Sequence, residues 1–185
     1  MKKLTIDNKK FKQLVSELAR QISMSGWRPD YIVGITRGGL LPAVMLSHYF
    51  EVPCETLKVS LRDGSDQESN LWMAEDALGY LNTEEIPRPK DMPASDPSLR
   101  KNILIVDDIN DTGATFNWII KDWQSGCMPN DAAWNSIWGN NVKFAVVVDN
   151  ASSNCDAAMN YFGMEIDKAK EDIWVDFPYQ TWWHK

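Results

Sequence analysis

Residues 105–115 read Ile105-Val-Asp-Asp-Ile-Asn-Asp-Thr-Gly-Ala-Thr115, and this segment decides the fold. It completes an apolar stretch that begins at residue 102, as expected of a strand buried on both faces, and a helical pattern follows it. Two aspartates therefore stand at the carboxyl end of a strand. Paired carboxylates there can hold a divalent metal, accept hydrogen bonds from a sugar diol or do acid–base work. The glycine and threonines after them form an anion cradle at a helix start, so the segment fits a phosphorylated sugar.

The rest of the chain alternates apolar strands with helical patterns, which predicts an α/β fold with a mainly parallel central sheet flanked by helices. In such sheets, ligands bind beyond the carboxyl ends of the strands. The glycine-bearing loops 36–39 and 111–115 both follow strands. Strands are expected at 31–35, 55–60, 102–107 and 143–149, with short extended pieces at 161–166 and 173–175; helices are expected at 11–22, 40–50 and 113–123.

Composition narrows the function classes. A length of 185 residues predicts one domain, residues 1–185, and a formal net charge of −7 with a pI near 4.8 argues against a nucleic-acid partner. The chain lacks the ~20 consecutive apolar residues that a membrane helix needs. Three separated cysteines without a C-x-x-C pair, and only two histidines, argue against zinc. Reduced cysteines are typical of a cytoplasmic protein, which is the predicted localisation.

The segment 61–101 has a different character, because four prolines interrupt it and acidic residues outnumber basic ones. Connections of this length are uncommon unless they carry function or move. We therefore expect a long flexible loop, in which residues 71–81 can form a short amphipathic helix.

Three segments resemble known proteins. Residues 105–115 resemble the phosphoribosyl-diphosphate (PRPP) motif of type I phosphoribosyltransferases. The segment 31–42 is similar to the pyrophosphate loop of bacterial xanthine-guanine (purine) phosphoribosyltransferases, and the segment 172–179 to their purine-binding hood. The resemblance implies the type I phosphoribosyltransferase fold, with a small hood over 150–185 and 61–101 as a long catalytic-loop insertion.

The resemblance implies a role for each residue of the PRPP motif. Asp107 and Asp108 would bind the ribose 2′- and 3′-hydroxyls and lie near Mg²⁺, the implied cofactor, which PRPP itself would hold for the most part. Asp111 would lie near the purine N7 as the catalytic general base or proton relay. The 5′-phosphate would be held by Asp111, Thr112, Gly113, Ala114 and Thr115.

The pyrophosphate loop would consist of Thr36, Arg37, Gly38 and Gly39. This loop often contains a non-proline cis peptide bond in the family, and Arg37–Gly38 is where the resemblance places it. Arg62, in the segment Ser60-Leu-Arg-Asp63, can contact pyrophosphate or be a solvated loop residue.

The base site implied by the resemblance comprises Asn150, Trp174, Val175 and Asp176. Trp174 would stack on the purine, and Val175 would offer backbone hydrogen bonds. Oxopurine-specific members carry a lysine where this chain has Asn150. An amide can donate to an oxo group or accept from an amino group, so guanine, xanthine, hypoxanthine, adenine and other bases remain open.

The implied protein is a Mg²⁺-dependent glycosyltransferase (pentosyltransferase) of purine salvage. It would transfer the 5-phosphoribosyl group from PRPP to a nucleobase, release pyrophosphate and assemble as a homodimer or tetramer. Three alternatives stand beside it. One is a different acceptor base, such as a pyrimidine. Another is a PRPP-sensing regulator without turnover, which usually needs a basic face. The third, a metal-dependent phosphatase, expects D-x-D-x-T, which residues 107–111 do not reproduce.

Overall fold

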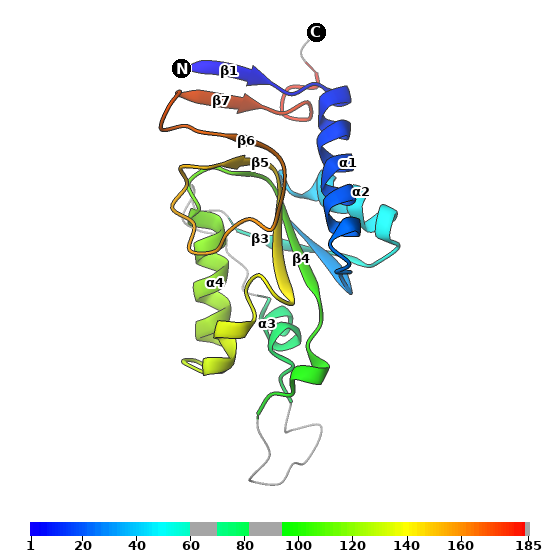
Figure 1. Ribbon diagram of the computed structural model, residues 1–185, viewed down its shortest axis with the longest axis vertical. Coiled ribbons are helices and arrows are strands. Elements are labelled where there is room, and N and C mark those ends of the chain that lie inside the picture. The colour runs from blue at the N-terminus through cyan, green and yellow to red at the C-terminus, as the bar shows by residue number, and fades with distance from the viewer. Residues whose placement is uncertain (60–69, 82–93, 184–185) are drawn as a thin grey trace.

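A five-stranded sheet forms the centre of the protein (Figure 1), and all of its strands are parallel. The structure is a computed structural model and describes residues 1–59, 70–81 and 94–183. The strand order is β3-β2-β4-β5-β6, so β4, which ends in the PRPP motif, lies in the middle. This confirms the predicted mainly parallel sheet. Its strands are β2 (Tyr31–Thr36), β3 (Cys54–Lys58), β4 (Ile103–Asn110), β5 (Val142–Asn150) and β6 (Tyr161–Ile166).

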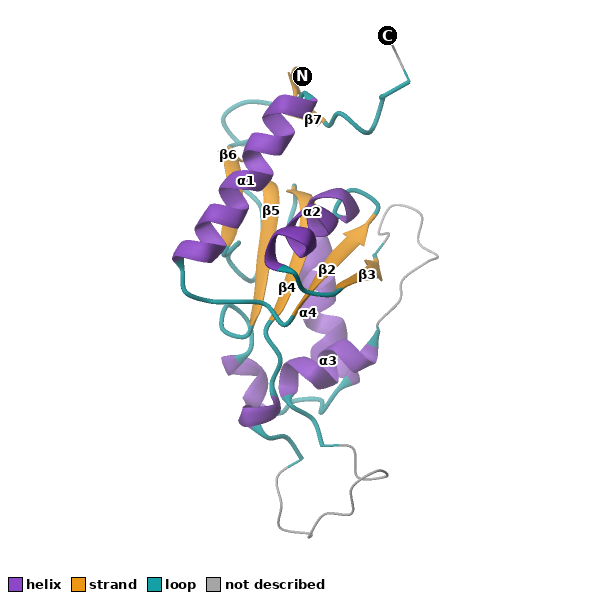
Figure 2. Ribbon diagram, turned by 90° about the vertical axis from the view of Figure 1, so that its right-hand side faces the viewer, coloured by secondary structure: helices purple, strands orange, loops and turns teal. Residues whose placement is uncertain are grey.

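Helices cover both faces of this sheet. On one face lie α1 (Asn8–Met24) and α2 (Leu40–Phe50) (Figure 2). They pack against side chains such as Leu104 and Val106. On the other, α3 (Leu71–Leu78) and α4 (Ala114–Gly126) pack against Ile103 and Ile105. Alternate residues of β4 therefore enter opposite halves of the core, as strand geometry requires. Two short 3-10 helices, η1 (Pro97–Leu99) and η2 (Ala132–Ser136), lie between these elements. Among the described residues, no helix is long and apolar enough to cross a membrane.

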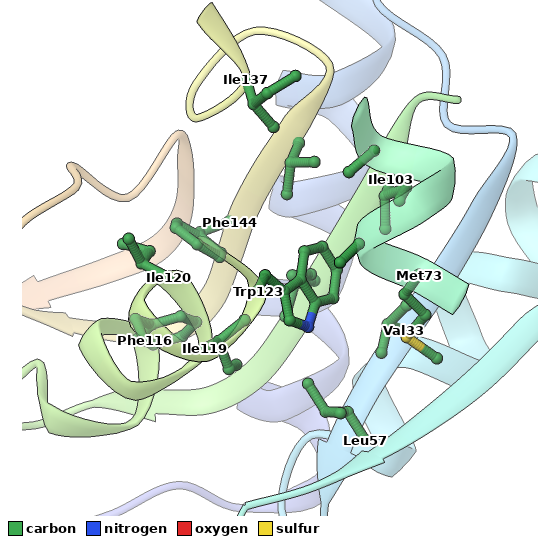
Figure 3. Packing of buried hydrophobic residues seen from close by; sticks show 14 of the residues in the cluster. Val33, Leu57, Met73, Ile103, Phe116, Ile119, Ile120, Trp123, Ile137 and Phe144 are labelled. Carbon is green, nitrogen blue, oxygen red and sulfur yellow. The ribbon is translucent and has the colours of Figure 1, made fainter. Parts of the chain in front are cut away.

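The half of the core beneath α4 is rich in aromatic rings. Trp123 of α4 is fully buried among aliphatic side chains of the sheet and α3 (Figure 3). Trp138 stacks on both Trp134 and Phe144, with ring centroids 5.7 and 5.8 Å away. Burying one such side chain stabilises a fold by roughly 1.5–3 kcal/mol, so this cluster anchors the helix whose first turn borders the PRPP motif.

Part of the segment 61–101 is packed structure. The predicted helix within it is present as α3, and its Met73 and Leu78 are buried in the core. Asn141, just before β5, donates a 2.8 Å hydrogen bond from its side chain to the Ala77 carbonyl. This contact places α3 at the edge where the strands begin, opposite the PRPP motif, so α3 does not cover that motif. Residues 60–69, which include Arg62, and 82–93 lie outside the described residues. A catalytic loop over PRPP therefore remains a prediction for the parts of 61–101 outside the described residues.

The hood contains a strand that the sequence did not reveal. The N-terminal strand β1 (Lys2–Thr5) pairs in parallel with β7 (Ile173–Asp176), and the two lie together beyond the main sheet (Figure 1). By contrast, β6 and the end of β5 belong to the main sheet, although both fall within the predicted hood 150–185. Within the predicted hood 150–185, β7 thus pairs with the other end of the chain, whereas β6 continues the main sheet. Four residues are too few to show a hydrophobic period, which explains why β1 was missed.

Candidate functional site

The acidic pair lies at the end of the central strand. The Asp108 backbone N–H donates to Asp107 Oδ1 over 2.8 Å. Burial and then repulsion from Asp108 hold the pKa of Asp107 well above its usual range. Burial also raises the pKa of Asp108, against the hydrogen bond that Tyr179 donates to it. The free pair therefore favours holding one proton between its two carboxyl groups.

Two glycines bring the pyrophosphate loop against this pair. A Cβ on Gly38 would overlap the carboxylate of Asp108, and one on Gly39 would overlap the Val106 carbonyl oxygen. Only glycine allows so close an approach to β4. The cis peptide bond is at Thr36–Arg37, so the expected position at Arg37–Gly38 was wrong by one bond. The reason is that β2 extends through Thr36 and the chain turns directly after it.

Arg37 is the basic residue of this loop. Its side chain is exposed, and within residues 1–59, 70–81 and 94–183 it forms no ion pair. The surface salt bridge that would give Arg37 a purely structural role is therefore absent from the described part of the chain. Its neighbour Gly38 is the residue of the loop that approaches Asp108.

The loop 111–115 is fixed from behind by the segment that follows β5. The Asn154 backbone N–H donates to the Thr112 carbonyl over 3.1 Å, and the Asn117 side chain bridges Asn154 and Asp156 at 2.8 and 2.7 Å. Gly113, at φ +86°, lies against the backbone of this segment, where a Cβ would be 2.6 Å from the nitrogen of Cys155. Gly113 therefore serves loop packing as well as the left-handed turn.

The opposite side of the same loop faces a cavity of about 310 Å³. Val59 and residues 107–116 line it, so the acidic pair and the start of α4 share one space. The first N–H groups of a helix have no partner within the helix and point outward at its positive end. The PRPP motif thus lines one cavity with two carboxylates and with the amides of a helix start, of which the Ala114 N–H is 3.3 Å from Thr112 Oγ1.

Asn150 has a different environment from the one predicted. Its buried side chain donates 2.7 Å from Nδ2 to the Asp111 carbonyl. Its Oδ1 accepts from the hydroxyl of Ser152 at 2.8 Å and from the backbone N–H of Lys168 at 3.0 Å. Because both ends of the amide have protein partners, Asn150 supports the backbone of Asp111 and Lys168 instead of presenting its amide to a base.

Lys168 is a site residue that sequence reasoning missed. Its Nζ lies 2.7 Å from Asp111 Oδ1, and the side chains of Lys168 and Asp111 are 23% and 39% exposed. This ion pair therefore borders solvent next to the cavity. Lys168 is far from Asp111 in the sequence and belongs to the turn after β6, so no local pattern could have connected the two.

The three residues predicted to bind the base from the hood differ in their exposure and in their partners. Trp174 is 44% exposed, whereas Val175 on the opposite face of β7 is buried in the core. Asp176 is ion-paired with Lys3 of β1 at 2.9 Å. None of these three lines the cavity of the PRPP motif. The contact between hood and motif is made by Tyr179, whose hydroxyl donates to Asp108 Oδ2 over 2.6 Å and which the sequence did not single out.

The acidic pair offers few ligands for a metal. Within the part of the chain that the structure describes, no group of three or more His, Cys, Asp or Glu side chains is arranged to hold an ion. Mg²⁺ requires a nearly octahedral set of oxygens. Asp107 and Asp108 fit Mg²⁺ only as a supplement to oxygens that a bound diphosphate and water supply.

A parallel sheet that ends in paired carboxylates and a helix start defines an α/β protein whose site fits a phosphorylated sugar. The family model for the phosphoribosyl transferase domain matches residues 5–181. The chain therefore belongs to the phosphoribosyltransferase family. No curated protein matches it.

Solved structures share the fold at low identity. A purine phosphoribosyltransferase from Pyrococcus horikoshii is 22% identical, with a TM-score of 0.60 over 97% of this chain and 94% of that one. The xanthine-guanine-hypoxanthine phosphoribosyltransferase of Helicobacter pylori is 17% identical, with a TM-score of 0.59 over the same shares. An orotate phosphoribosyltransferase from Aeropyrum pernix is 16% identical, with a TM-score of 0.50 over 86% and 73%. These likenesses confirm the type I phosphoribosyltransferase fold.

Proposed function

We propose that this protein transfers the 5-phosphoribosyl group of PRPP to a purine base and releases pyrophosphate, a reaction of nucleotide salvage. The observation that carries this proposal is the cavity formed by residues 107–116, which combines an acidic pair with a helix start. A ribose 5-phosphate needs both: acceptors for its hydroxyls and donors for its phosphate.

The sugar phosphate would occupy the cavity in one orientation. Its 5′-phosphate lies at the backbone N–H groups of 112–115, with the hydroxyls of Thr112 and Thr115 as further donors. Its 2′- and 3′-hydroxyls lie at Asp107 and Asp108. The diphosphate extends toward the loop 36–39, where Arg37 is available. Mg²⁺ would be held mainly by this diphosphate and would neutralise the charge that builds up on the leaving group.

The base would meet an acceptor and a donor side by side. Asp111 would accept the proton at N7 of the purine, and Lys168, 2.7 Å from it, would donate to an oxygen at C6. This pair favours an oxopurine over adenine, whose amino group would face the ammonium. It also disfavours orotate, whose carboxylate would approach Asp111. In this arrangement, Lys168 takes the recognition role that the sequence suggested for Asn150.

Trp174 remains the proposed stacking residue for the base. Its ring is half exposed on a strand whose other face is buried, so the ring is available to a ligand. Val175 and Asp176 would contribute through the backbone of β7, because their side chains are occupied by the core and by Lys3.

One assay tests the proposal. The protein is incubated with PRPP, Mg²⁺ and guanine, xanthine, hypoxanthine, adenine or orotate in turn, and pyrophosphate release is followed. We expect release with at least one oxopurine and slower release with adenine and orotate. PRPP binding without release for any base would instead support a regulator without turnover. Release with orotate alone would replace the purine by a pyrimidine.

A further inference from the structure

The hydroxyl of Tyr179 reaches the acidic pair from outside the PRPP motif. Tyr179 follows β7 in the chain, and its Oη lies 2.6 Å from Asp108 Oδ2. The same carboxylate lies against Gly38 of the pyrophosphate loop. Asp108 is thus the residue at which the PRPP motif, the pyrophosphate loop and the hood meet.

The ring that carries this hydroxyl is held by other aromatic rings. Phe177 stacks on it at a centroid distance of 5.7 Å and an interplanar angle of 12°. Phe11 of α1 packs edge-on at 5.8 Å and 82°. Phe11 and Phe177 are themselves buried and in edge contact, with centroids 6.3 Å apart. Because such an arrangement fixes the ring, the position of the hydroxyl is set by the core.

The contact favours one state of Asp108. An O–H donor stabilises the ionised carboxylate, and this hydrogen bond lowers the pKa of Asp108 against the effect of burial. Tyr179 remains a donor, because burial and the neighbouring Asp108 charge raise the pKa of its hydroxyl. A carboxylate has about four acceptor positions, so Asp108 can keep this bond and still accept from a ribose hydroxyl.

We propose that Tyr179 is a positioning residue of the ribose site, which holds Asp108 against Gly38 as an oriented acceptor and so connects the hood with PRPP binding. The inference rests on the proposed function, because it takes the ribose hydroxyls of PRPP as the ligands of Asp108. It adds that affinity for the sugar phosphate depends on a residue of the hood, outside the PRPP motif.

The test compares Tyr179→Phe with Tyr49→Phe, a tyrosine on α2 that is 60% exposed and far from the motif in the sequence. Titration calorimetry measures the Kd of PRPP with Mg²⁺, and initial rates give KM and kcat. For Tyr179→Phe we expect PRPP binding about tenfold weaker, the size expected for one lost hydrogen bond to a charged group, with the KM of the base unchanged. Tyr49→Phe should match the wild type in all three quantities.

The difference between PRPP affinity and the KM of the base separates positioning from a general loss of structure, because a damaged fold would weaken the binding of both substrates. An unfolding midpoint equal to that of Tyr49→Phe would show that the fold is intact. Equal or tighter PRPP binding by Tyr179→Phe would overturn the inference while leaving the proposed function standing. A wild-type protein that does not bind PRPP would overturn both.

Discussion

The two halves of the proposed site are built in different ways. The half that would bind the sugar phosphate consists of contiguous residues at the end of β4 and the start of α4. All of these residues line one cavity. The half that would bind the base draws on the turn after β6 and on β7, which is paired with the N-terminal strand. The first half is a local structure, whereas the second exists only after distant segments have packed.

Because of this difference, the two halves should tolerate different amino-acid substitutions. The donors of the sugar-phosphate half are largely backbone N–H groups, which every residue except proline supplies. Its shape therefore depends on Gly113 and on the packing behind it. The base half depends on individual side chains, above all Lys168. Substitutions in the base half should therefore change what is accepted, whereas those around the motif should change whether PRPP reacts at all.

The largest effect is expected for Asp111→Asn, at the border between the halves. Removing a general base typically lowers turnover by about 100-fold or more. PRPP affinity should change little, because the backbone of residue 111 and the cradle remain. Steady-state kcat and the Kd of PRPP check this, with the exposed Asp172→Asn as the matched control. Unchanged turnover would remove Asp111 from the mechanism.

Asn150→Lys should damage the junction between the halves. The substitution removes the side-chain donor to the Asp111 carbonyl and the acceptor for the Lys168 N–H, and it introduces an ammonium at a buried position. We expect a loss of about 2 kcal/mol in the free energy of unfolding, measured by urea denaturation. Asn140→Lys, at an exposed position, should stay within about 0.5 kcal/mol of the wild type. Unimpaired stability with better oxopurine use would restore Asn150 as a base contact.

Lys168→Met tests the base half alone. Loss of one charged donor to an oxo group should lower the ratio of kcat/KM for hypoxanthine to that for adenine by about tenfold. The Kd of PRPP should stay close to the wild-type value. Lys170→Met is the control, because Lys170 is exposed and pairs with Asp167 instead. An unaltered ratio would show that Lys168 does not contact the base.

Asp107→Asn should have the smallest effect. It should raise the free energy of unfolding, whereas Asn150→Lys should lower it. The folded state raises the pKa of Asp107, so folding is favoured below the ordinary carboxyl pKa near ~4, and this advantage is lost as the pH rises through the raised value. Asparagine cannot ionise, so the variant should be more stable than the wild type at pH 8, and the gain should disappear near pH 4. Thermal unfolding at both pH values measures this gain. A destabilised variant at pH 8 would contradict the raised pKa of Asp107.

The sequence predicted the parallel sheet, the helix within 61–101 and the strand–loop–helix around Asp107, because each is a local pattern. It could not predict the partners of a side chain. Asn150 lies at the end of a strand, where a base contact is expected. Its side-chain oxygen, however, accepts a hydrogen bond from the backbone N–H of Lys168 in the turn after β6. Tyr179 likewise looked like part of the hood, and only tertiary packing brings its hydroxyl to Asp108. Local pattern therefore revealed the sugar-phosphate half, and three-dimensional contacts were needed for the other.

The central claim is that residues 107–115 bind the ribose 5-phosphate part of PRPP. Calorimetric titration of PRPP with Mg²⁺, in competition with ribose 5-phosphate or 2-deoxyribose 5-phosphate, tests it most directly. We expect ribose 5-phosphate to compete and the 2-deoxy sugar to compete about tenfold less well, because it lacks one hydroxyl for the acidic pair. Equal competition by the two sugars, or no PRPP binding at all, would contradict the claim.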